Sequence, residues 1–129
     1  MALNNLVVDT NIFIEYLRAK DKLKTTLISI PDHTAIFISS VTLYELYMGA
    51  ASEEKKTDIR LLTDDLQILP FNESVAIKAS EIFHDLRKSN QLIEFRDIFI
   101  AATSIVFDIG LKTSNTKHFK RIQGLRLSR

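Results

Sequence analysis

Apolar and polar positions follow the same order twice in the first half of the chain. Residues 6–8 form a short apolar run that ends at the polar residues 9–11, and apolar residues then recur at helical spacing over residues 12–17. Residues 35–38 form a second apolar run, which ends at residues 39–40 and leads into another helical pattern. Apolar runs are typical of buried strands, and recurrence every three to four residues is typical of helices. The pattern predicts two successive strand–turn–helix units.

The rest of the chain predicts further short strands and helices in alternation. In order, these are a charged helix at 53–65, a strand at 67–69, an amphipathic helix at 73–88, a buried helix at 98–109 stopped by Gly110, a strand at 111–113, a short helix at 115–122 and a strand at 125–127. Apolar strands that alternate with helices imply a parallel sheet that is covered on both faces. We therefore expect an α/β fold of three layers, with four or five short parallel strands between helices.

Size and composition limit the kind of protein. A length of 129 residues with 46% hydrophobic residues fits a single domain over 1–129. Apolar runs stay far below the roughly 20 residues of a membrane-spanning helix, and the N-terminus lacks the pattern of a secretory signal. We expect a soluble, cytoplasmic protein with no membrane partner. The sequence has no cysteine, so any metal must be held by oxygen or imidazole ligands.

Charge is balanced in total but not along the chain. The 17 Lys and Arg residues and 16 Asp and Glu residues give a net charge of +1. All the acids precede residue 110, whereas the stretch from Lys112 onward is basic and free of acids. A basic strip can neutralise the phosphates of a polyanion, or it can simply be a solvated end of the chain. Charge alone leaves both interpretations open.

Three acids fall where a site is expected, since ligands of parallel α/β sheets bind beyond the carboxyl ends of the strands. Asp9 follows the first strand, Glu45 lies one turn into the helix after the second, and Asp97 precedes the buried helix. Each has an ordinary explanation: Asp9 and Asp97 as helix caps, Asp97 with Arg96 as an ion pair, Glu45 with Thr42 as a capping box. Together they predict an oxygen-ligand site for Mg²⁺, or Mn²⁺, that activates water against a phosphodiester. The residues alone thus indicate a nuclease or a phosphatase.

Four segments in this order resemble the four successive motifs of PIN-domain ribonucleases, most closely those of the VapC toxins of bacterial type II toxin–antitoxin systems. They are VDTN with Ile14 from residue 8, SVTLYEL with Gly49 from residue 40, DIFIAA from residue 97, and TSNT with His118-Phe119 from residue 113. The resemblance runs from about Leu6 to the C-terminus. It implies a PIN-like fold, a metal-dependent endoribonuclease toxin, a homodimer, and a co-expressed antitoxin of the VapB type that inhibits the toxin.

Carried over position by position, Asp9, Glu45 and Asp97 match the three core acids of the family and are the expected metal ligands and catalytic residues. The fourth acidic position falls at Asn115, which is also expected to be catalytic. An amide brings no negative charge, so we expect a second cation to bind more weakly than the first. Asn115 could instead cap the short helix that follows it.

The remaining site candidates are polar residues near these acids. They could contact substrate or order the acids, although turn and capping roles explain several of them equally well: Thr10, Asn11, Ser40, Thr113, Lys117 and Lys120. None of the histidines, His33, His84 and His118, is a persuasive ligand or general base.

The resemblance implies an RNA substrate, in particular a structured RNA with an exposed single-stranded loop, because unpaired nucleotides can enter a narrow acidic site. A signalling receiver domain is the first alternative, but it would need paired acids near the first strand and a late Lys-Pro, and the sequence has neither. A catalytically impaired PIN-like module that binds protein or RNA is the second alternative, supported by Asn115.

Overall fold

Four parallel strands form the centre of the molecule in the computed structural model, which describes residues 4–128. They are β1 (Asn4–Val8), β2 (Thr34–Ser39), β3 (Gln67–Leu69) and β4 (Gly110–Lys112). The strand order is β3-β2-β1-β4, and each neighbouring pair is parallel. The first strand of the chain therefore lies inside the sheet, between β2 and β4.

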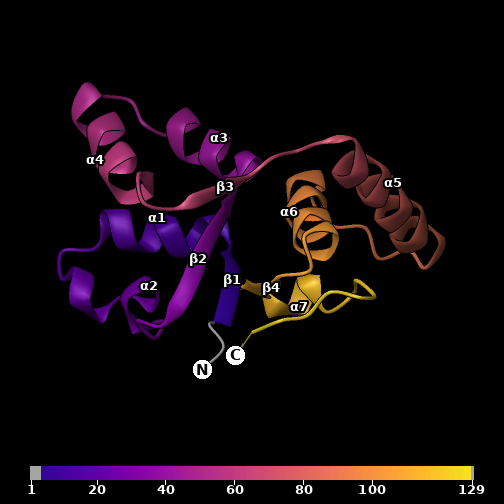
Figure 1. Cartoon of the computed structure of the whole chain (residues 1–129). Helices are drawn as coiled ribbons and strands as arrows, with labels where there is room; N and C mark the ends of the chain where they lie inside the picture. The colour runs from indigo at the N-terminus through magenta and orange to yellow at the C-terminus, as the bar shows by residue number, and fades with distance from the viewer. Residues whose placement is uncertain (1–3, 129) are drawn as a thin grey trace.

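Helices cover both faces of this sheet (Figure 1). They are α1 (Thr10–Arg18), the 3-10 helix η1 (Lys22–Lys24), α2 (Thr26–Ser29), α3 (Ser40–Met48), α4 (Glu53–Thr63), α5 (Glu73–Lys88), α6 (Phe95–Val106) and α7 (Thr116–Phe119). Figure 1 shows α1, α2 and α4 to the left of the sheet and α5, α6 and α7 to its right. Within residues 4–128, no helix is both long and apolar enough to cross a membrane.

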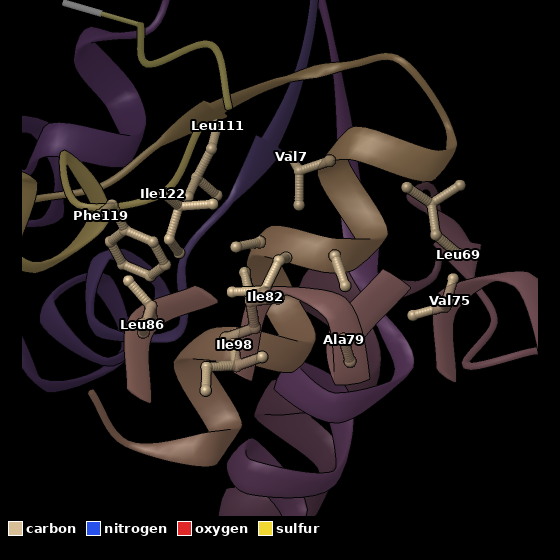
Figure 2. Packing of buried hydrophobic residues seen from close by; sticks show 13 residues of the cluster. Val7, Leu69, Val75, Ala79, Ile82, Leu86, Ile98, Leu111, Phe119 and Ile122 are labelled. Carbon is tan, nitrogen blue, oxygen red and sulfur yellow. The ribbon is translucent and has the colours of Figure 1, made fainter. Parts of the chain in front are cut away.

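Two hydrophobic clusters lie on opposite faces of the sheet. Val7 and Val8 are adjacent in β1, and both are fully buried. Val7 packs in a cluster with residues of α5, α6 and α7, whereas Val8 packs in a cluster with residues of α1, α2, α3 and α4. Figure 2 shows the first cluster, in which Val7 and Leu111 of the sheet face Ile82 and Ile98. Helices pack on both faces of the sheet, which confirms the three-layer α/β fold expected from the apolar runs. The runs are apolar because strands that are covered on both faces need apolar side chains on both.

The largest shift of an element concerns the buried helix. The expected range of 98–109 is wrong at both ends, because α6 begins at Phe95 and ends at Val106. The chain then turns at Asp108, whose φ of 55° lies in the left-handed region. Gly110 does not stop the helix but begins β4, where its neighbour on β1 is Leu6. Asp97 consequently lies in the first turn of α6 rather than before it.

Smaller differences occur near the C-terminus and after α1. The expected strand at 125–127 is wrong, since Leu127 makes only an isolated parallel bridge to Leu111. The short helix is Thr116–Phe119 rather than 115–122. The charged helix ends at Thr63 rather than 65, and the strand expected at 111–113 begins at Gly110 and ends before Thr113. Elements such as η1 and α2 escape a search for periodicity because they span a single turn.

Candidate active site

Asp9 lies between β1 and α1 and is the N-cap of α1. Its side chain is held at both oxygens. Oδ1 accepts a 2.8 Å hydrogen bond from the backbone N–H of Thr10, and Oδ2 accepts a 2.7 Å hydrogen bond from the hydroxyl of Thr113, just beyond β4. Burial raises the pKa of Asp9, while the hydrogen bonds from Thr113 and Thr10 act in the opposite direction. Asp9 is thus both a helix cap and a buried acid at the carboxyl edge of the sheet.

Glu45 projects from α3 toward α1 and α6. Its Oε1 accepts a 2.9 Å hydrogen bond from the hydroxyl of Thr10, and its Oε2 lies 3.3 Å from Nη1 of Arg96. The hydroxyl of Thr10 also lies 2.9 Å from that of Thr42. Glu45 is therefore oriented by residues from two other helices, and its side chain is only 15% exposed.

The capping interpretations of Glu45 and Asp97 do not describe the structure. Ser39 is the N-cap of α3, and its hydroxyl accepts a 3.0 Å hydrogen bond from the backbone N–H of Thr42. Thr42 and Glu45 therefore form no capping box. The N-cap of α6 is Glu94, three residues before Asp97. Both acids are thus placed by packing rather than by helix capping.

Asp97 shares the acidic environment of Asp9 and Glu45. Its pKa is raised to about 6, chiefly by burial and then by the negative charges of Asp9 and Glu45, with a smaller contribution from Glu94. Arg96, the neighbour of Asp97 in sequence, makes its ion pair with Glu45. The three acids come from three separate segments, and Asp9 and Glu45 lie close enough to Asp97 for their charges to oppose its ionisation.

The donor chemistry of these acids suits a hard divalent cation, which prefers carboxylate oxygens and relieves their mutual repulsion. As the side chains stand, however, no three His, Asp or Glu residues within 4–128 form a metal-ligand group. Each oxygen of Asp9 and of Glu45 already has one protein partner, and each keeps a second lone pair. The residues therefore fit a cation chemically.

Asn115 and His118 form a polar pair at the start of α7. The backbone N–H of Asn115 donates a 3.0 Å hydrogen bond to the Thr113 hydroxyl, and its side-chain Nδ2 donates a 2.9 Å hydrogen bond to Nδ1 of His118. Asn115 occupies the N-cap position, yet its side chain bonds to His118 rather than to the backbone of α7. His118 in turn acts to lower the pKa of Asp97, so its ring lies within electrostatic reach of that acid.

The sequence analysis did not assign a role to His118. The available signal was its position three residues after Asn115 at the start of a helix, a spacing that brings two side chains together. That signal is weak because the same spacing occurs on every amphipathic helix.

The other candidates divide into buried and exposed groups. Thr10 and Thr113 are both 6% exposed, and their hydroxyls hold Glu45 and Asp9. Their observed contacts order the acids. Ser40 is half-buried, and its hydroxyl accepts a 3.1 Å hydrogen bond from the backbone N–H of Phe71, which ties α3 to the segment after β3.

Asn11, Lys117 and Lys120 are exposed. Asn11 is in the first turn of α1, next to Asp9. Lys117 lies in α7, which also carries His118, and Lys120 is the C-cap of that helix. These three side chains are the predicted substrate contacts that solvent can reach.

Comparison with known proteins connects this arrangement to one family. The sequence profile of the PIN domain matches residues 6–125. Ribonuclease VapC1 of Rickettsia felis is 33% identical over 129 residues, covering 95% of this chain and 93% of the relative. Ribonuclease VapC10 of Mycobacterium tuberculosis is 31% identical over 121 residues, covering 94% of this chain and 90% of the relative.

Solved structures agree with the sequence relatives. VapBC2 from Rickettsia felis, bound to a DNA fragment from its promoter, contains a chain that matches with a TM-score of 0.82 at 25% identity, covering 96% of this chain and 97% of that chain. DNA-bound VapBC from Salmonella typhimurium matches in fold with a TM-score of 0.84, covering 98% of each chain. With a domain match from residue 6 to residue 125 and relatives of 31% and 33% identity, the chain belongs to the PIN-domain family, among the VapC ribonucleases.

Proposed function

We propose that this protein is a metal-dependent endoribonuclease that acts as the toxin of a toxin–antitoxin pair. The observation that carries the proposal is the shared environment of Asp9, Glu45 and Asp97 at the carboxyl edge of the sheet, where the charges of the first two raise the pKa of the third. Three carboxylates that repel one another form a site short of positive charge. A divalent cation and a phosphodiester that approaches it are the partners such a site can use.

The chain's own contribution is to hold the acids in place. Thr113 fixes Asp9 from the end of β4, and Thr10 fixes Glu45 from the first turn of α1. Asn115 orients the ring of His118, which lies within electrostatic reach of Asp97. Asp9, Glu45 and Asp97 would hold the cation. When bound, Mg²⁺ or Mn²⁺ supplies positive charge that activates water and neutralises charge developing on the phosphodiester.

RNA is the proposed substrate, with cleavage in an exposed single-stranded loop. Support comes from the relatives, which are named ribonucleases, and from exposed cations in and directly after α7. Lys117 and Lys120 lie on the segment that carries Asn115 and His118, where their charges can meet backbone phosphates. Unpaired nucleotides can be splayed toward an acidic edge that a duplex could not enter.

A VapB-type antitoxin and a second copy of the chain are the proposed protein partners. The solved relatives include VapBC complexes, which supports the antitoxin. An apolar face between α3 and α6 supports the homodimer, since Tyr44, Met48 and Phe95 are 61%, 58% and 61% exposed there. Contiguous exposed apolar side chains mark interaction surfaces. Phe95→Glu should shift the protein toward a monomer in sedimentation velocity, with Leu23→Glu, another exposed apolar position, as the control.

The function is tested by incubating the purified protein with a stem-loop RNA, and with DNA of the same sequence. We expect loop cleavage of the RNA in Mg²⁺ or Mn²⁺, loss of cleavage in EDTA, and recovery when Mn²⁺ is added back. Cleavage that persists in EDTA would contradict the metal dependence.

A binding module without catalysis remains the second candidate. It is favoured by the neutral Asn115 at the fourth acidic position of the family. The same experiment separates the two: RNA binding without cleavage in any cation would support the module.

A further inference from the structure

Arg96 occupies the carboxylate that the proposed cation needs. Its Nη1 lies 3.3 Å from Oε2 of Glu45, the oxygen left free by the hydrogen bond from Thr10 to Oε1. Glu45 is 15% exposed and Arg96 is 41% exposed. The guanidinium thus reaches from solvent to a partly buried acid, and each oxygen of Glu45 has a protein partner in this arrangement.

The pair also alters the charge that a cation meets. Arg96 and Asp97 are adjacent on α6, but the guanidinium is directed toward α3. A guanidinium in this place offsets one of the three negative charges and repels a divalent cation that approaches the same carboxylate. The ion pair of Arg96 is with Glu45, so Glu45 is the carboxylate whose affinity for a cation it lowers most.

We propose that Arg96 is a built-in counter-ion that competes with the divalent cation for Glu45, so that the cation binds more weakly while Arg96 holds this carboxylate. The inference rests on the proposed function, because it concerns affinity for the same cation. Of the three acids Asp9, Glu45 and Asp97, Glu45 is the one that is paired with a positively charged side chain of the protein itself within residues 4–128. Arg96 is then a positioning residue whose removal tightens cation binding.

A purely structural role for Arg96 predicts something different. A partly exposed ion pair contributes at most about 1 kcal/mol to stability, and its loss would lower the melting temperature without changing affinity for a cation. The two roles therefore separate in a binding measurement on RNA-free protein.

The experiment measures Mn²⁺ binding by isothermal titration calorimetry for the wild type, Arg96→Gln and Arg126→Gln. Arg126 is the matched control, because it forms a 3.0 Å ion pair with Asp108 beyond the amino end of β4, and its replacement removes the same charge. We expect Arg96→Gln to bind Mn²⁺ roughly fivefold more tightly, which corresponds to about 1 kcal/mol. Arg126→Gln should stay within about twofold of the wild type, a change that a remote, screened charge can produce.

A second measurement guards against a change in folding. For each variant, the melting temperature is measured without metal and in saturating Mn²⁺. The rise caused by Mn²⁺ should be largest for Arg96→Gln. Arg96→Lys keeps the charge and should bind Mn²⁺ with an affinity closer to that of the wild type.

Each contrary result has a distinct meaning. Saturable binding to the wild type that Arg96→Gln leaves unchanged or weakens overturns the role of Arg96 but not the proposed function. Absence of Mn²⁺ binding in every variant overturns the metal site and this inference together.

Discussion

The hydroxyl of Thr113 donates a 2.7 Å hydrogen bond to Oδ2 of Asp9, although the two residues are 104 positions apart in the chain. The contact exists because β1 and β4 are parallel neighbours, with Val8 beside Lys112, so the residues that follow each strand emerge together. An acid at the end of the first strand is therefore held by the end of the last. The same hydroxyl accepts the backbone N–H of Asn115, which links Asp9 to the start of α7.

Replacing Thr113 tests this link. Thr113→Val keeps the shape of the side chain but leaves the buried Asp9 without one of its two hydrogen bonds, so the pKa of Asp9 should rise further. We expect the free energy of unfolding at pH 7 to fall by about 2 kcal/mol, as measured by urea denaturation. Thr113→Ser retains the hydroxyl and should stay closer to the wild type. Equal denaturation midpoints for the Val and Ser variants would contradict the link.

Asp97→Asn should abolish RNA cleavage and stabilise the metal-free fold at neutral pH. The pKa of Asp97 is about 6 in the folded protein, compared with 3.8 ordinarily. Between these values the folded state holds more protons than the unfolded state, so stability falls as the pH rises from 3.8 to about 6. Above pH 6 the full cost of the ionised Asp97 is present, and below 3.8 it is absent. Asparagine removes this cost.

The measurement is a set of melting temperatures for metal-free wild type and Asp97→Asn from pH 3.5 to 8. We expect the variant to melt about 3 °C higher above pH 7, allowing for solvent screening of a half-buried group, and equally near pH 3.5. Asp85→Asn makes the same change at an exposed position of α5 and should show no such trend. Retained cleavage by Asp97→Asn would remove Asp97 from the catalytic residues.

Reversing the charge of Lys117 and Lys120 should weaken RNA binding. Lys117 is exposed in α7 and Lys120 is exposed at its C-cap, so the double change to Glu removes two cations from the proposed phosphate path. We expect roughly tenfold lower affinity, and a salt slope reduced by about one unit for each lysine that contacts a phosphate. Fluorescence anisotropy on an Asp9→Asn background measures binding without cleavage. Lys20→Glu with Lys24→Glu, beyond the far end of α1, is the matched control.

Asn115 can be tested by adding the charge that it lacks. Asn115→Asp should lower the Mg²⁺ concentration needed for half-maximal cleavage by severalfold, because a carboxylate binds a second cation better than an amide does. Asn115→Ala should slow cleavage less than Asp9→Asn does. The Ala variant also frees the His118 ring, which NMR detects as a change in its tautomer. If Asn115→Ala lowers only the melting temperature and leaves the Mg²⁺ dependence unchanged, Asn115 is a structural residue.

The sequence predicted the layers of the fold well because both faces of the sheet are covered. Val7 and Val8 belong to different clusters, so β1 is apolar throughout and is visible as a run. The same reasoning placed Asp9 at a strand end. It failed at residues 125–127, where alternating apolar residues pack against the sheet through a single bridge from Leu127.

The partners of the acids could not be predicted from the sequence. Thr10 and Glu45 are 35 positions apart, and the hydrogen bond between them depends on how α1 packs against α3. Arg96 precedes Asp97, but it pairs with Glu45 because neighbouring side chains on a helix diverge. Periodicity gives the face of a helix, whereas these contacts depend on the direction of single side chains.

The position of β1 in the strand order has a consequence for protein synthesis. β1 is made first, yet its neighbour β4 and the hydroxyl that holds Asp9 are made more than 100 residues later. Asp97 and its helix also emerge late, after α5. A nascent chain on the ribosome can pair β1 with β2 and β2 with β3, but its acidic edge stays incomplete until residue 113 has been synthesised and released from the exit tunnel. Until then, Asp9 lacks the Thr113 hydroxyl that holds its Oδ2 in the finished fold.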